Sequence, residues 1–133
     1  MSERADSLTG VWQGLYTYPS INKSVSFTAT LIETPAAALS GSTHEPRAFR
    51  DGGGGTLFAT LLGSRQGRSV VFRKTYDGAG PNYDTVDYEG TLSADGIEIA
   101  GRWVIQRVWS GTFLMIRETG NATARRRKAL QRA

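Results

Sequence analysis

Eight short segments rich in β-branched and aromatic residues follow one another along the chain, about a dozen residues apart. Clusters of Gly, Pro, Asn and Asp separate them, and no amphipathic helix longer than three turns is expected before residue 120. This alternation of short strands and turns is typical of all-β proteins. The predicted strands are 10–18, 24–34, 38–45, 56–64, 69–76, 84–93, 97–106 and 109–118.

Short connections between consecutive strands favour an up-and-down meander, and eight such strands are expected to close because closure removes both unpaired edges. Gly96, in the connection Ala94-Asp95-Gly96, is expected to adopt a positive φ. Glycines inside strands fit the sharp bends of a barrel, and they occur at Gly14, Gly41, Gly63, Gly90, Gly101 and Gly111. We therefore predict an all-β, eight-stranded antiparallel up-and-down β-barrel with a short basic C-terminal tail.

The length of 133 residues fits one domain. We expect an N-terminal extension over residues 1–8, a β-barrel domain over residues 9–119 and a basic tail over residues 120–133. Residues 1–120 hold 11 basic and 12 acidic side chains, so the body is nearly neutral, which argues against a nucleic-acid-binding domain. The tail is either dispensable or a site of electrostatic attachment to nucleic acid or an anionic membrane.

The chain contains no cysteine, which excludes disulfides, thiol nucleophiles and thiolate metal sites. Its first residues, 1–7, lack the apolar region of a signal peptide, and no run approaches the roughly 20 apolar residues of a membrane helix. We expect a cytoplasmic protein without a membrane span.

Gly10 and Trp12 open the first predicted strand, and Arg117 lies near the end of the last. In a barrel these strands are neighbours, so the guanidinium can lie over the indole in a cation–π contact. Gly-x-Trp, a late Arg and eight strands together resemble the calycin group, which includes lipocalins, fatty-acid-binding proteins and avidins. The resemblance implies that Trp12 and Arg117 close one end of the barrel and that the interior holds a small, mostly apolar ligand.

The chain also departs from the calycin families. It leaves no room for the helical lid of fatty-acid-binding proteins, and it lacks the disulfides of most lipocalins and the biotin-contacting pattern of avidins. The stretch Gly10-x-Trp12-x-Gly14 followed by Tyr18-Pro19 is similar to the opening of haem-binding nitrobindin barrels, which take an axial histidine from late in the chain. The single histidine here, His44, falls in the third strand, where a surface position is expected, so we predict no cofactor and no metal.

If Trp12 points inward, the two-residue period of strands assigns most of the interior. The third and fourth strands stay ambiguous, because residues 57–62 are apolar on both faces. The other strands are expected to turn these residues inward: Gly14, Tyr16, Tyr18, Val25, Phe27, Ala29, Leu31, Val70, Phe72, Lys74, Tyr76, Val86, Tyr88, Leu92, Ile97, Ile99, Trp103, Ile105, Trp109, Phe113, Met115 and Arg117.

Apolar walls with a few polar groups are typical of a small-molecule site. The candidate ligand-binding residues are Tyr16, Tyr18, Phe27, Phe72, Lys74, Tyr76, Tyr88, Trp103, Trp109 and Phe113. A buried ammonium needs a partner, so Lys74 either meets a carboxylate such as Glu45 or Asp87 or awaits an anionic ligand. A shift of one residue in the fifth strand would instead expose Lys74 and bury Val71 and Arg73. For the tyrosines an alternative to ligand binding is equally favoured: they are amphipathic rings at the mouth of the barrel, with their hydroxyls in water.

Three functions follow as hypotheses. The first is a cytoplasmic barrel that binds a small hydrophobic or amphipathic molecule, with an acidic ligand as one option. The second is a cofactor-independent enzyme of the cyclase, isomerase or lyase type that uses Lys74 with Tyr76 or Tyr88 as acid and base. The third is a barrel filled by its own side chains, with Leu114 and Ile116 outward as a homodimer surface.

Overall fold

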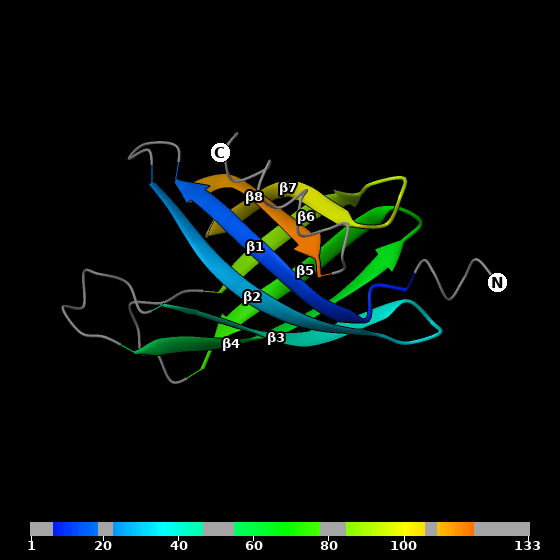
Figure 1. Ribbon diagram of the computed structural model, residues 1–133, viewed down its shortest axis with the longest axis horizontal. Coiled ribbons are helices and arrows are strands. Elements are labelled where there is room, and N and C mark those ends of the chain that lie inside the picture. The colour runs from blue at the N-terminus through cyan, green and yellow to red at the C-terminus, as the bar shows by residue number, and fades with distance from the viewer. Residues whose placement is uncertain (1–6, 19–22, 47–54, 78–84, 106–108, 119–133) are drawn as a thin grey trace.

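The computed structural model describes residues 7–18, 23–46, 55–77, 85–105 and 109–118. Each strand pairs antiparallel with the next, and β8 pairs with β1, so the sheet closes into a barrel (Figure 1). The strands are β1 (Gly10–Tyr18), β2 (Lys23–Glu33), β3 (Ala38–Pro46), β4 (Thr56–Gln66), β5 (Ser69–Tyr76), β6 (Val86–Leu92), β7 (Glu98–Ile105) and β8 (Trp109–Arg117).

The predicted fold class is confirmed, and each predicted strand boundary lies within two residues of the observed one. The basic tail over residues 120–133 lies outside the described residues. Within the described part of the chain, no helix is long and apolar enough to cross a membrane.

The register of β5 is the predicted one. Val70, Phe72 and Lys74 are buried, whereas Val71 and Arg73, which alternate with them, are exposed. This alternation excludes the shifted register and places the ammonium of Lys74 inside the barrel.

The structure also resolves the ambiguous β4. Leu57, Ala59 and Leu61 are buried in the interior, and Phe58 and Leu62 are exposed on the outer face. Both sets are apolar, so only pairing with β3 and β5 decides which one faces the core.

One end of the barrel, the closed end, is sealed by Trp12. Its indole is fully buried and donates a hydrogen bond from Nε1 to the Leu8 carbonyl over 2.9 Å. The guanidinium carbon of Arg117 lies 4.7 Å from the centroid of the Trp12 ring, and the same group donates to the carbonyls of Ser7 and Gly96. Gly96 has a φ of 75°, as the turn prediction required. The expected contact between the first and last strands is therefore present.

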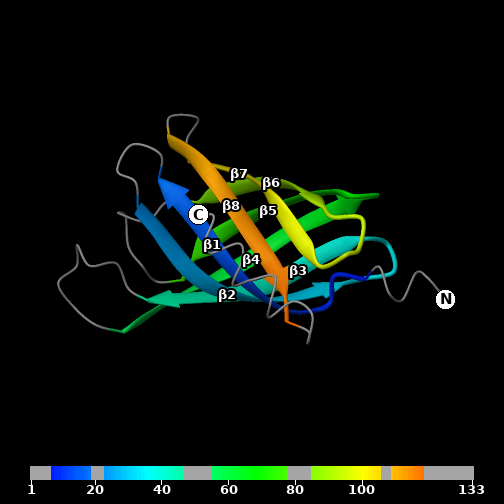
Figure 2. The same ribbon diagram turned by 45° about the horizontal axis from the view of Figure 1, so that its top comes forward.

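The opposite end of the barrel, the far end, gathers the last residues of β1, β3, β5 and β7. In an antiparallel meander these strands all run away from Trp12, so Tyr18, Pro46, Tyr76 and Ile105 come together there. Figure 2 shows the strands wound around the axis between the two ends.

Gly14, in the middle of β1, leaves space for an aromatic ring in the barrel interior. Gly14 on β1 pairs with Phe27 on β2, and a Cβ added at Gly14 would overlap the Phe27 ring. The missing side chain lets this ring lie across the interior, as expected for a glycine inside a strand.

Two predictions fail around the turn before β7. Ile97, expected inside, lies in this turn and packs with Ile116 and Leu114 in a small cluster apart from the main core. Ile116 was expected to be exposed as part of a dimer surface, but Ile97 packs against it and it is only 3% exposed. The homodimer itself stays a prediction.

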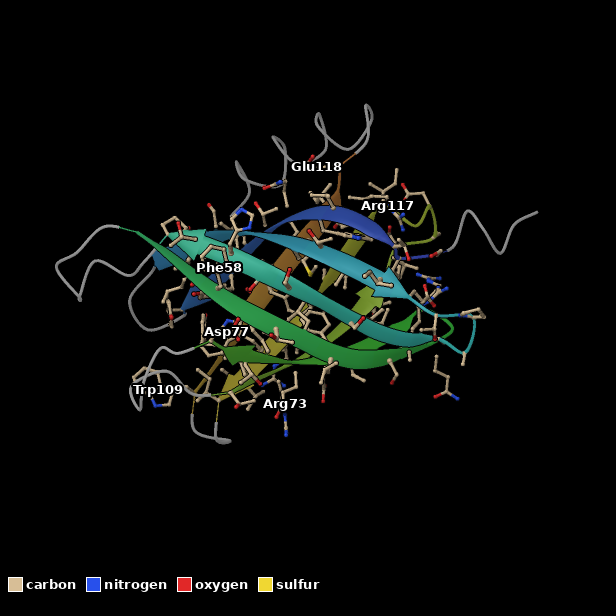
Figure 3. The ribbon with its side chains drawn as sticks, turned by 90° about the horizontal axis from the view of Figure 1, so that it is seen from below. Phe58, Arg73, Asp77, Trp109, Arg117 and Glu118 are labelled. Carbon is tan, nitrogen blue, oxygen red and sulfur yellow. The ribbon has the colours of Figure 1, made fainter. Side chains whose placement is uncertain are left out.

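Trp109 also departs from the prediction. It has the inward parity of Phe113 and Met115 but is the first residue of β8, where the strand leaves the core, and it is 58% exposed. Figure 3 shows Trp109 at one end of the barrel and Arg117 towards the other.

Candidate functional site

A buried ion pair lies in the barrel interior. The Nζ of Lys74 on β5 lies 2.8 Å from Oε1 of Glu45 on β3, and the two side chains are only 1% and 3% exposed. The sequence offered Glu45 and Asp87 as partners for this lysine. The structure selects Glu45, because Asp87 points outward and pairs with Arg73 on the surface.

Three donors converge on the Glu45 carboxylate. Besides Lys74, the Tyr16 hydroxyl donates to Oε2 over 2.6 Å and the Tyr76 hydroxyl donates to Oε1 over 3.1 Å. A buried carboxylate is tolerated only when its oxygens are hydrogen-bonded and its charge is balanced. Both conditions hold here.

Aromatic rings surround the ammonium of Lys74. Its Nζ lies 4.9 Å from the ring centroid of Tyr16, 5.0 Å from that of Phe27, 4.8 Å from that of Tyr76 and 5.7 Å from that of Tyr88. The Tyr88 hydroxyl also accepts a long hydrogen bond of 3.5 Å from Nζ. Cations are attracted to ring faces at such distances. We call Glu45, Lys74, Tyr16, Tyr76 and Tyr88 the polar cluster.

Burial shifts the acidity of these groups. It lowers the pKa of Lys74, and the adjacent Glu45 carboxylate opposes this shift. It raises the pKa of Tyr16, Tyr76 and Tyr88, and the charge of Glu45 and the neighbouring tyrosines add to the effect. At neutral pH the three phenols therefore keep their protons, and Tyr16 and Tyr76 donate to Glu45 while Tyr88 accepts from Lys74.

Aromatic side chains form the interior wall on the side of β5 to β8. The ring of Phe72 stacks on that of Tyr88 at 4.8 Å, and Phe113 meets Tyr88 edge-on at 4.9 Å. Trp103 meets Tyr18 edge-on at 5.3 Å. These arrangements are favourable ring pairs, so they stabilise the packing of this aromatic wall.

Most of the predicted ligand-binding residues meet in this region. All but Trp109 belong to the main core or pack against it, with Tyr18 and Tyr76 partly buried. Their role in binding stays a prediction. Sequence reasoning named Glu45 only as a partner of Lys74 and did not name Thr43, which is buried on the same face of β3. In residues 42–45 polar side chains occur on both faces of the strand, so alternation gave no signal there.

The site holds no recognisable metal centre in the described part of the chain, where no three His, Asp or Glu side chains cluster. His44 is exposed on the outer face of β3, with its ring centroid 6.3 Å from that of Phe58. Its side chain therefore does not face the barrel interior.

The fold and the site together define a closed eight-stranded up-and-down β-barrel with a polar cluster in its interior. No protein-family model matches the sequence, and the search of curated proteins found no match. A redesigned β-barrel is similar in structure, with a TM-score of 0.69 and 14% identity over 84% of this chain and 92% of that one.

A de novo designed fluorescence-activating β-barrel is also similar, with a TM-score of 0.63 and 12% identity over 89% of this chain and 100% of that one. At these identities the likenesses show the barrel fold alone. They do not single out the calycin group, so that resemblance rests on Gly10, Trp12 and Arg117.

Proposed function

We propose that the barrel binds a small, mostly apolar and uncharged molecule in its interior, with the ligand's polar group beside the polar cluster. The observation that carries this proposal is the convergence of an ammonium, a carboxylate and three phenols among aromatic walls. Sites for small molecules have this composition. The structurally similar designed barrel, described as fluorescence-activating, adds support.

An uncharged ligand is favoured over an acidic one. The Lys74 charge is already balanced by Glu45 at 2.8 Å. A ligand carboxylate would bring a second negative charge close to Glu45, and like charges repel strongly in a poorly solvated interior. The acidic ligand considered from the sequence therefore becomes the alternative that the experiment must exclude.

Binding is also favoured over acid–base catalysis. Burial raises the pKa of Tyr76 and Tyr88, so their phenols are poor bases at neutral pH. Lys74 forms an ion pair with Glu45 at 2.8 Å, and an ammonium that already carries its proton cannot act as a base. A cytoplasmic location, expected from the sequence, remains part of the proposal.

The experiment compares two fluorescent probes with the same ring systems, neutral N-phenyl-1-naphthylamine and its sulfonated analogue 8-anilino-1-naphthalenesulfonate. We expect the neutral probe to bind at least about tenfold more tightly, because it leaves the ion pair undisturbed. Phe58→Ser, which removes an exposed apolar side chain from the outer face of β4, should leave both affinities unchanged.

Glu45→Gln provides the matched interior variant. It leaves Lys74 without its carboxylate. The affinity for the sulfonated probe, relative to that for the neutral probe, should therefore rise about tenfold. Tighter binding of the sulfonate by the wild type would support the acidic ligand instead. Failure of both probes to bind would mean that side chains fill the barrel, and loss of binding in Phe58→Ser would place the probe outside.

A further inference from the structure

One buried polar atom of the described interior lacks a partner. Thr43 on β3 is 2% exposed, and its Oγ1 has no hydrogen-bond partner among the described residues. Buried hydroxyls nearly always have a partner, because leaving one unpaired is unfavourable. A group that the described residues do not supply is therefore expected at this position.

The side chains next to Thr43 are small. In the register of the sheet it pairs with Ala29 on β2 and with Ala59 on β4, and both alanines are buried. The same row continues to Trp12 beyond Ala29 and to Tyr76 beyond Ala59. In this row three neighbouring strands thus present small inward side chains, which lie between two large aromatic residues.

This small-residue wall adjoins the polar cluster. Thr43 and Glu45 lie two residues apart on the same face of β3, a spacing of about 7 Å in a strand. Because β3 runs towards the far end, Glu45 lies on the far-end side of Thr43. A molecule beside Glu45 and Lys74 could therefore extend along the wall to the Thr43 hydroxyl.

We propose that Ala29, Thr43 and Ala59 form a ligand subsite in which the Thr43 hydroxyl hydrogen-bonds a hydroxyl or carbonyl group of the bound molecule. This inference rests on the proposed function and names the ligand class more closely. A threonine hydroxyl both donates and accepts, so it suits an alcohol, a phenol or a ketone. In this proposal the methyl groups of Ala29 and Ala59, which are buried, contact the apolar part of the molecule that carries this group.

The test uses two neutral aromatic probes that differ by one hydroxyl, 2-naphthol and naphthalene, measured by equilibrium dialysis at neutral pH. Wild type should bind 2-naphthol about tenfold more tightly than naphthalene, the effect of one buried hydrogen bond. Thr43→Val removes the hydroxyl and should abolish this preference, whereas Thr43→Ser should retain it. Thr30→Val, on the exposed outer face of β2, is the matched control and should behave as wild type.

The outcomes separate this inference from the proposed function. Equal binding of both probes by wild type, or a preference that survives Thr43→Val, would overturn the Thr43 subsite while leaving interior binding intact. Binding of neither probe would contradict the proposed function and the subsite together. Without ligand, Thr43→Val should melt no lower than wild type, because no bond is lost. A melting temperature several degrees lower would show that water already satisfies the hydroxyl, which would also overturn the subsite.

Discussion

The ammonium of Lys74 and the carboxylate of Glu45 meet 2.8 Å apart inside the barrel, on two strands that flank β4. Neither side chain reaches solvent, so each charge depends on the other for its stability. The pair links β3 to β5 across their common neighbour, inside a mostly apolar core.

Removing one partner of this pair should destabilise the fold. In Lys74→Met the Glu45 carboxylate stays buried without a counter-charge, and we expect a loss of about 3–5 kcal/mol in the free energy of unfolding. The double variant Lys74→Met with Glu45→Leu removes both charges and should recover most of this loss. Urea unfolding of the three proteins measures both effects. A Lys74→Met protein as stable as wild type would contradict the buried pair.

Opening the closed end should also destabilise the barrel. Trp12→Ala removes a fully buried indole, and such truncations cost about 3–5 kcal/mol. Arg117→Ala removes charge-assisted hydrogen bonds to backbone carbonyls, and we expect about 1.5–3 kcal/mol. Neither variant should change the preference between the neutral and sulfonated probes, because the polar cluster is untouched. Arg102→Ala, at an exposed position on β7, is the control, and equal melting of all three variants would refute closure by Trp12.

Stability should fall at alkaline pH. Burial raises the pKa of Tyr16, Tyr76 and Tyr88 above the ordinary value of 10.0, so the folded protein keeps protons that the unfolded chain releases near that pH. The stability they contribute is fully present below pH 10 and is lost as the pH rises further. Lys74 acts in the opposite sense. Because its pKa is lowered in the folded protein, the free energy of unfolding rises with pH up to the ordinary lysine pKa of 10.5.

Three tyrosines outweigh one lysine above pH 10, so the net change there is a loss. Urea unfolding at stepped pH, together with the ultraviolet absorbance of tyrosinate, measures the two processes side by side. The three buried phenols should ionise only as the protein unfolds, and Tyr16→Phe should make the decline shallower. Ionisation of all tyrosines near pH 10 in a protein that stays folded would be the opposite result.

The sequence predicted the fold well because the strands are short, regular and separated by clear turn residues. It favoured an inward Lys74 because Lys74 has the parity of Phe72, but the shifted register stayed open because Val70 and Val71 are both apolar. The inward position of Thr43 could not be predicted from the sequence, because residues 42–45 are polar on both faces of the strand. Only the pairing with Ala29 and Ala59 reveals which face is inside. Trp109 was misplaced because alternation gives the direction of a side chain but not where the core ends along the strand.

The most direct test of interior binding is to determine which residues a bound neutral probe contacts. Nuclear Overhauser effects between N-phenyl-1-naphthylamine and assigned methyl groups distinguish the inside of the barrel from its outer face. We predict contacts between the probe and the methyl groups of Thr43, Ala29 and Ala59, which are buried. Contacts confined to Ile32 and Leu62, which are exposed apolar side chains of the outer face, would contradict it.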